Sequence, residues 1–275
     1  MGKRDNLATR REPTMAETAD RHELYEASVQ DVEAEVDFLL ETFHERRGRE
    51  PATFREDFCG TASASCEWVR RGDDKVAIGV DFDRPTLDWG RSNRVARLPD
   101  AAQARVRLVE ADVLEVETAP VDVVGAFNFS YWTFRTREQM RHYFERVRAA
   151  LADDGLFMLD AFGGSEAYEE LKEKTKHDDF TYIWEQAVFH PVSGYMKTYI
   201  HFKFPDGSKL KKAFTYEWRL WGLPEIRELL LEAGFADVTV YWEGEDEDGE
   251  GNGEFEPDAK GAADPGWIVY IVATK

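Results

Sequence analysis

The sequence predicts an α/β fold: a doubly wound, mostly parallel seven-stranded sheet with helices on both faces, an antiparallel β insertion and an N-terminal helix. Two observations predict it. Strand-like and helix-like segments alternate between residues 53 and 162, and helices of roughly ten to fifteen residues between strands are typical of parallel β-α-β units. After Gly164 the alternation stops, and strand-like segments follow one another with only turns between them.

The N-terminal part is expected to be a flexible tail over 1–19 and a helical lid over 20–48. Between Asp20 and Arg46, apolar residues recur at steps of three and four, from Leu24 to Phe43. This spacing forms one apolar stripe and predicts a helix. Gly48 ends that helix, because glycine is the usual residue just past a helix end.

The Rossmann-like part is expected to cover 49–164 and 220–275. In its first half, the predicted strands are Thr53–Phe58, Val76–Asp81, Val106–Glu110, Val121–Phe129 and Leu156–Phe162, and the predicted helices are Ala62–Arg71, Pro85–Leu98 and Arg137–Leu151. Right-handed crossovers then place helices on both faces of one sheet.

The segment 165–219 is expected to be an antiparallel insertion that covers the substrate. Its predicted strands are Thr181–Phe189, Tyr195–Phe204 and Lys209–Arg219. The second half of the Rossmann-like part then adds a helix at Pro224–Ala233 and strands at Asp237–Trp242 and Trp267–Thr274. Between these last strands, the acidic and glycine-rich stretch Glu243–Asp258 is expected to be a solvated loop.

The composition restricts the partners. The 275-residue chain has 55 acidic and 35 basic residues, a net charge of −20. Such a surface repels phosphate groups, so we expect neither nucleic acid nor an anionic membrane as a partner. Two cysteines give no disulfide framework and no metal pattern, which suits a cytoplasmic location. The sequence leaves the assembly open, a homodimer included.

Polar residues follow the predicted strands at their carboxyl ends, where ligands bind in doubly wound sheets. The first strand leads into a turn at Gly60, which lets the backbone approach a ligand, and then into a helix N-terminus. The second ends at Asp81, whose carboxylate can accept from ribose hydroxyls. The third leads to Asp112 and Val113, which suit an adenine amino group and ring. The fourth ends at Asn128, facing the reacting centre.

This order of motifs resembles the class I (Rossmann-like) S-adenosylmethionine-dependent methyltransferase family, in its small-molecule type. The family's first motif usually reads Asp-x-Gly-x-Gly-Thr-Gly. Here Glu56 takes the place of the acid and Gly60 that of the middle glycine, whereas Phe58 and Ala62 replace the outer glycines. Phe58 could crowd the methionine end of the cofactor, or reshape the loop so that Asp57 rather than Glu56 meets it.

The resemblance implies S-adenosyl-L-methionine as cofactor and S-adenosyl-L-homocysteine as product. The residues expected at the cofactor are Tyr25, Glu56, Asp57, Phe58, Gly60, Thr61, Asp81, Phe82, Asp112, Val113 and Asn128. The implied reaction is in-line methyl transfer to an N, O or S nucleophile of a small molecule. Because the donor is already activated, the enzyme chiefly supplies alignment, and a base is needed only if the nucleophile must lose a proton.

Candidates for a catalytic role are Tyr25, Asn128 and His201. Aromatic side chains of the insertion and of the fourth strand end could bind a planar acceptor or a cationic amine, or could instead form the apolar face of the inserted sheet. The expected substrate-binding residues are Tyr131, Trp132, Trp184, Tyr199, Tyr216 and Trp218.

Two other functions remain open at this stage. The irregular first motif is compatible with a module that binds an adenosine ligand without methylating. The acidic stretch 243–258 could recruit a basic protein or peptide as the methyl acceptor. A nicotinamide dinucleotide is excluded because Phe58 and Ala62 interrupt the glycine pattern that admits a pyrophosphate.

Overall fold

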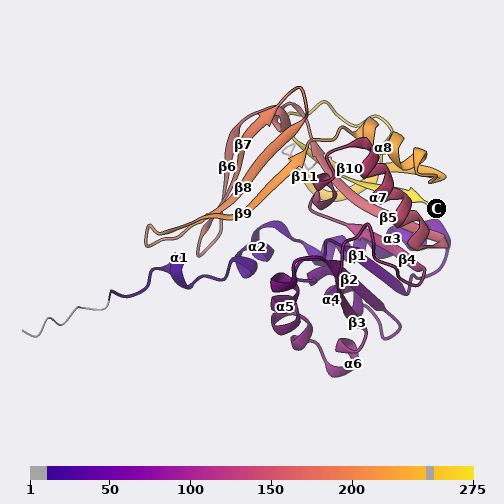
Figure 1. The fold of residues 1–275 in the computed structure, drawn as a ribbon, viewed down its shortest axis with the longest axis horizontal. Coiled ribbons are helices and arrows are strands. Elements are labelled where there is room, and N and C mark those ends of the chain that lie inside the picture. The colour runs from indigo at the N-terminus through magenta and orange to yellow at the C-terminus, as the bar shows by residue number, and fades with distance from the viewer. Residues whose placement is uncertain (1–10, 246–250) are drawn as a thin grey trace, which may run out of the picture.

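The computed structural model describes residues 11–245 and 251–275. Its main sheet has eight strands in the order β11-β10-β12-β5-β4-β1-β2-β3 (Figure 1). The parallel strands are β1 (Thr53–Asp57), β2 (Val76–Asp81), β3 (Val106–Glu110), β4 (Val121–Ala126) and β5 (Leu151–Gly163). The antiparallel end consists of β12 (Trp267–Thr274), β10 (Asp237–Glu245) and β11 (Gly251–Pro257). The predicted α/β class is confirmed, with one strand more than expected.

Helices cover both faces of this sheet, as predicted, because side chains of consecutive strand residues point to opposite faces. On one face, α3 (Val32–Arg47) and α4 (Ser63–Arg70) pack over Val123. On the other, α7 (Arg137–Ala150) and α8 (Leu223–Glu232) pack over Val124. The remaining short helices are α5 (Arg84–Asn93), α6 (Asp100–Gln103), η1 (Val95–Arg97), η2 (Ser130–Thr133) and η3 (Ser165–Tyr168).

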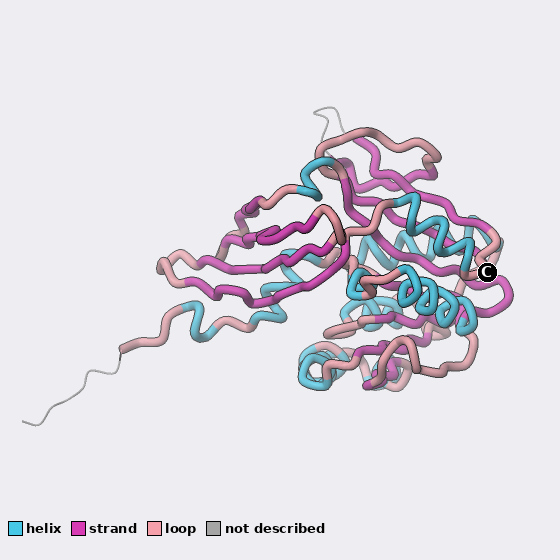
Figure 2. Tube along the Cα trace, turned by 45° about the horizontal axis from the view of Figure 1, so that its top comes forward, coloured by secondary structure: helices cyan, strands magenta, loops and turns pink. Residues whose placement is uncertain are grey.

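The insertion is a separate antiparallel sheet of four strands in sequential order, β6 (Leu171–Lys176), β7 (Thr181–His190), β8 (Tyr195–Lys203) and β9 (Lys209–Arg219). It projects from the main body, and α1 (Met15–Thr18) and α2 (Arg21–Val29) run beside it (Figures 1 and 2). Three strands were predicted. The additional one, β6, is a lysine-rich edge strand with little apolar alternation, as edge strands often are.

The predicted single helix Asp20–Arg46 is wrong: the chain forms α2 and α3 with a break at Gln30 and Asp31. Asp31 starts the second helix, because its carboxylate accepts a hydrogen bond from the backbone N–H of Ala34 (3.2 Å). Within the predicted tail, residues 1–10 lie outside the described part. α1 is attached to the inserted sheet by a hydrogen bond from the Met15 N–H to Asp206 (2.9 Å).

The prediction of a loop over Glu243–Asp258 is also wrong for the described residues. β10 continues to Glu245, and β11 pairs with it in antiparallel register. Phe255 gives a reason, because its ring packs 4.5 Å from that of Tyr270 and anchors an otherwise acidic strand. Residues 246–250 lie outside the described part. None of the described helices has both the length and the apolar character of a membrane-spanning helix.

A buried ion pair lies at the centre of the main sheet. The Arg55 guanidinium donates to both carboxylate oxygens of Asp57 (2.7 and 2.8 Å), and the Tyr143 hydroxyl donates to one of them (3.0 Å). The side chains of Arg55 and Asp57 are 1% and 0% exposed. Ligand contact by Asp57 was therefore a wrong expectation: this carboxylate belongs to the core and holds β1 against α7.

We predict that Asp57→Ala destabilises the fold by about 3–5 kcal/mol, because it leaves the Arg55 charge buried without a partner. Tyr143→Phe should cost about 1 kcal/mol, since it removes one hydrogen bond and no charge. Urea unfolding measures both. A loss below about 1 kcal/mol for Asp57→Ala would contradict this assignment.

Candidate functional site

The loop after β1 keeps the backbone of a glycine-rich turn although two glycines are replaced. Phe58, Gly60 and Ala62 have φ angles of 57°, 52° and 62°, all in the left-handed region that favours glycine. The Phe58 ring lies 5.6 Å from Tyr143 and 6.0 Å from Phe134, between ring centroids. Its side chain thus packs toward the core, and the loop retains its usual shape.

Two carboxylates hold this loop. The buried Glu56 accepts hydrogen bonds from the Ser65 N–H (2.8 Å) and hydroxyl (2.6 Å), which fixes the start of α4. Asp81, at the end of β2, accepts from the backbone N–H groups of Gly60 (2.9 Å) and Asp83 (2.8 Å). Burial raises the pKa of Glu56 to about 7 and also raises the pKa of Asp81. Glu56 therefore holds the loop from its buried side, whereas Asp81 lies at its open side.

The open side of the loop fits an adenosine. A Cβ atom placed on Gly60 would meet only a Thr86 methyl at 3.9 Å, so the backbone here is accessible. The Phe82 ring is 72% exposed beside Asp81 and offers a flat apolar surface. Asp112 is exposed, with one oxygen accepting from the Leu114 N–H (2.9 Å).

Val113 was expected to pack on the adenine ring. It is only 4% exposed and belongs to the main core cluster together with Val80. This expectation is wrong because the short turn after β3 directs the Val113 side chain inward.

The N-terminal lid reaches the same loop through Glu26, a residue that the sequence did not single out. One Glu26 oxygen accepts hydrogen bonds from the hydroxyls of Thr61 (2.6 Å) and Ser63 (2.8 Å). Its other oxygen forms an ion pair with Arg94. Helix α2 is thus fastened to the loop between β1 and α4.

A cavity of about 710 Å³ lies between the carboxyl edge of the main sheet and one face of the inserted sheet, and α2 contributes to its lining. Among the residues predicted from the sequence, five line it: Tyr25, Asn128, Trp184, Tyr216 and Trp218. They come from three different parts of the chain. The structure therefore brings them together, and their contact with a ligand stays a prediction.

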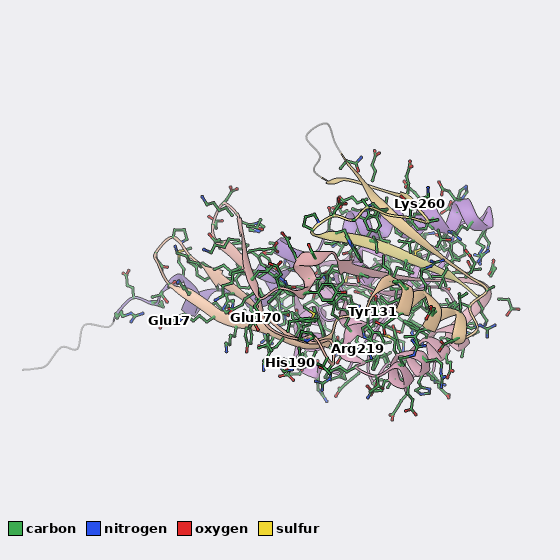
Figure 3. The ribbon with its side chains drawn as sticks, turned by 90° about the horizontal axis from the view of Figure 1, so that it is seen from above. Glu17, Tyr131, Glu170, His190, Arg219 and Lys260 are labelled. Carbon is green, nitrogen blue, oxygen red and sulfur yellow. The ribbon has the colours of Figure 1, made fainter. Side chains whose placement is uncertain are left out.

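Four of the residues predicted for catalysis or substrate binding do not line this cavity. On β8, Ile200 faces the cavity, so the alternation of strand side chains directs Tyr199 and His201 to the opposite face. There, His201 is hydrogen-bonded to Glu185 (2.9 Å). Tyr131, labelled in Figure 3, and Trp132 are 0% exposed and belong to the core. The catalytic role expected for His201 is therefore wrong. So are the substrate contacts expected for Tyr131, Trp132 and Tyr199.

Two buried acids at the cavity were missed. Glu35, on α3, and Asp160, on β5, are each 7% exposed and both line it. Asp160 accepts hydrogen bonds from the N–H groups of Asn128 (2.7 Å) and Phe129 (2.9 Å), two residues in left-handed conformation. For Asp160 the signal was present in the sequence, because it stands between Leu159 and Ala161 in an apolar strand. Glu35 stands between Glu33 and Asp37 and gave no such signal.

Comparison with known proteins identifies the fold. No protein-family model matches the chain, and no curated protein matches it. Solved structures do match. A S-adenosylmethionine-dependent methyltransferase from Clostridium acetobutylicum aligns with 16% identity and a TM-score of 0.67, covering 92% of this chain and 96% of its own.

Two further matches are DesVI from Streptomyces venezuelae and CalS10, an amino pentose methyltransferase from Micromonospora echinaspora. DesVI aligns with 16% identity and a TM-score of 0.66, covering 93% of this chain and 98% of its own. CalS10 aligns with 16% identity and a TM-score of 0.64, covering 92% and 95%. The chain therefore has the fold of class I S-adenosylmethionine-dependent methyltransferases over nearly its whole length.

The buried acids predict an unusual dependence of stability on pH. Burial raises the pKa of Glu35 to about 8, so the folded protein holds a proton that the unfolded chain releases near pH 4.5. The free energy of unfolding should fall as pH rises from about 4.5 to 8. Glu35→Gln should make the free energy of unfolding depend less on pH. At pH 8 it should raise that free energy by about 1–2 kcal/mol, which corresponds to a rise in Tm of a few degrees.

Thermal unfolding between pH 5 and 8.5 measures this effect. Glu33→Gln, an exposed position on the same helix α3, is the matched control and should keep the wild-type slope over this range. Identical slopes for the wild type and Glu35→Gln would show that Glu35 is ionised throughout.

Proposed function

From this fold and the geometry at its sheet edge, we propose that the chain is an S-adenosyl-L-methionine-dependent methyltransferase that acts on a small molecule. Its product from the cofactor is S-adenosyl-L-homocysteine. The observation that carries the proposal is the arrangement of two adjoining half-sites at one sheet edge. One is the accessible Gly60 loop with Asp81 and Phe82, and the other is the cavity of about 710 Å³.

In this proposal the cofactor lies over the carboxyl ends of β1, β2 and β3. The Gly60 backbone and the start of α4 lie at its methionine end, Asp81 accepts from the ribose hydroxyls, and Phe82 and Asp112 meet the adenine. When bound, S-adenosylmethionine supplies an electrophilic methyl group. Asp81 has the capacity for this role, since its Oδ2 accepts from the Gly60 N–H and its Oδ1 from the Asp83 N–H, and a carboxylate oxygen can accept a second hydrogen bond.

The acceptor in this proposal occupies the cavity. Asn128 lines it at the end of β4, next to the cofactor half, while Trp184, Tyr216 and Trp218 cover it from the inserted sheet. The protein's contribution is enclosure and alignment of the two reactants, which is a large part of the rate advantage in such displacements. A volume of this size suits a small molecule better than a folded protein.

The location and assembly belong to the same proposal. Cys59 and Cys66 are buried and free, which supports a reducing, cytoplasmic environment. A homodimer is compatible with the proposal, and sedimentation of the full chain would measure it.

Titration calorimetry with S-adenosylmethionine and S-adenosylhomocysteine tests the cofactor half. We expect binding of both, and no heat together with no thermal shift at millimolar ligand would exclude the proposal. Incubation with S-adenosylmethionine and a panel of small acceptors then tests turnover. Binding without methylated product across the panel would instead favour the adenosine-binding module.

Asp81→Ala should weaken S-adenosylhomocysteine binding by about 1–3 kcal/mol, because hydrogen bonds to a charged group are lost. Asp122→Ala is the matched control. Asp122 also accepts two backbone N–H groups, those of Ala52 (2.7 Å) and Thr53 (2.9 Å), but at the opposite edge of the sheet. The Asp122→Ala variant should be less stable than the wild type and should bind S-adenosylhomocysteine with unchanged affinity. Equal affinities of wild type and Asp81→Ala would mean that Asp81 only holds the loop.

A further inference from the structure

The lining of the acceptor cavity carries one sign of charge. Six carboxyl groups line it, and among the described lining residues there is no lysine, arginine or histidine: the acids are Asp31, Glu35, Asp160, Glu166, Glu173 and Glu243. Because a cavity with low-dielectric walls concentrates such a field, it repels phosphates and carboxylates and attracts cations. The whole chain, with a net charge of −20, adds to this preference.

The two deepest acids differ in what they bind. Asp160 is satisfied by the N–H groups of Asn128 and Phe129. Glu35 is more than nine-tenths buried and lines the cavity, yet within the described chain no side chain or backbone group donates a hydrogen bond to its carboxylate or pairs with it. A buried carboxyl group without a donor is costly, so proteins rarely keep one without a partner. A donor that enters from the cavity would supply this partner.

Aromatic rings form the opposite wall of the cavity. The rings of Tyr216 and Trp218 are stacked with centroids 4.5 Å apart, and the Trp184 ring is 6.3 Å from that of Trp218. The faces of such rings attract cations, and they also cover apolar parts of a ligand. Both walls therefore favour the same kind of ligand, a small organic molecule that carries a positively charged group.

We propose that the methyl acceptor is an amine that enters as its ammonium ion, and that the Glu35 carboxylate holds this ammonium group in the cavity. The proposal deepens the methyltransferase function proposed above and rests on it. A neutral alcohol or thiol would leave Glu35 without a strong donor, and an anionic acceptor would meet a lining of six carboxyl groups and no basic side chain among the described lining residues.

Glu35 also suits the proton transfer that an amine requires. Burial and neighbouring acids raise its pKa to about 8, near the range in which a carboxylate can accept a proton at neutral pH. The titratable groups that face Glu35 are Asp31, Glu56, Asp160, Tyr25 and Tyr270.

The proton balance follows from this arrangement. The ammonium gives one proton to the Glu35 carboxylate and becomes a neutral amine with a free lone pair. That lone pair forms the new carbon–nitrogen bond as the carbon–sulfur bond of the methyl donor breaks, and the electron pair remains on sulfur. The product is again a cation, and Glu35 returns its proton to water.

The test uses the full chain loaded with S-adenosylhomocysteine and two sets of matched probes. One set is phenethylamine, 2-phenylethanol and 3-phenylpropanoate; the other is glucosamine, glucose and gluconate. Calorimetry should show that at least one amine binds roughly 10- to 100-fold more tightly than its neutral and anionic counterparts. Equal or tighter binding of the neutral or anionic members, or no binding of either amine at millimolar concentration, overturns the proposal.

Glu35→Gln should abolish the preference for the amine while S-adenosylhomocysteine binding persists. Glu185→Gln, which removes a carboxylate from the outer face of the inserted sheet, should keep the preference. An unchanged preference in Glu35→Gln also overturns the proposal. The comparison of probes on the wild type stands even if a variant does not fold.

Proton release gives a second readout that needs no turnover. Since the cation favours ionised Glu35, binding below pH 8 should release a proton, seen as heats that depend on the ionisation enthalpy of the buffer. Affinity should rise with pH toward about 8, and Glu35→Gln should remove both effects. If S-adenosylhomocysteine does not bind but the amine preference remains, the methyltransferase function fails and the ammonium site stands.

Discussion

Carboxylates that accept backbone N–H groups at the carboxyl edge of the main sheet are the interactions on which the rest of the site depends. Asp81 holds the Gly60 loop, and Asp160 holds the left-handed pair Asn128 and Phe129. Such loops need acceptors close to exposed N–H groups, and aspartate reaches them with the shortest side chain. The consequence is electrostatic as well as structural, because these acids make this edge of the sheet acidic. Burial raises the pKa values of Asp81 and Asp160, and the accepted N–H groups offset part of that rise.

Much of the fold was predictable because its signals are local. The alternation of apolar strands and amphipathic helices identified β1 to β5, and turn residues identified the antiparallel insertion. Elements that depend on distant partners were missed. β11 is acidic and glycine-rich, and it becomes a strand only because β10 offers an edge and Phe255 reaches Tyr270. The division of the N-terminal helix was missed for a different reason: Asp31 is the N-cap of α3, but no glycine or proline stands at Gln30 or Asp31 to mark the break in the sequence.

The candidate site was predictable where backbone shape decides the outcome. The glycine-rich loop was found although Phe58 and Ala62 replace glycines, and both residues adopt the φ angles that glycine would. The inserted sheet shows the limit of the sequence. The alternation along β8 places Ile200 on one face and Tyr199 and His201 on the other. It does not say which face meets the main domain, and the prediction that Tyr199 and His201 face the ligand was wrong. Deep acids such as Glu35 were missed because a carboxylate in a helix is normally read as surface.

Helix α2 joins the two half-sites into one unit. Tyr25 lines the acceptor cavity, while the next residue, Glu26, binds Thr61 and Ser63 at the start of α4. Any ligand that changes the position of α2 therefore acts on both halves. Because coupling between two binding sites is reciprocal, an acceptor that orders α2 strengthens cofactor binding by the same factor by which the cofactor strengthens acceptor binding. The short segment after α2 leads directly to α3 and Glu35, so α2 links the Gly60 loop to the carboxyl group that we propose holds the acceptor.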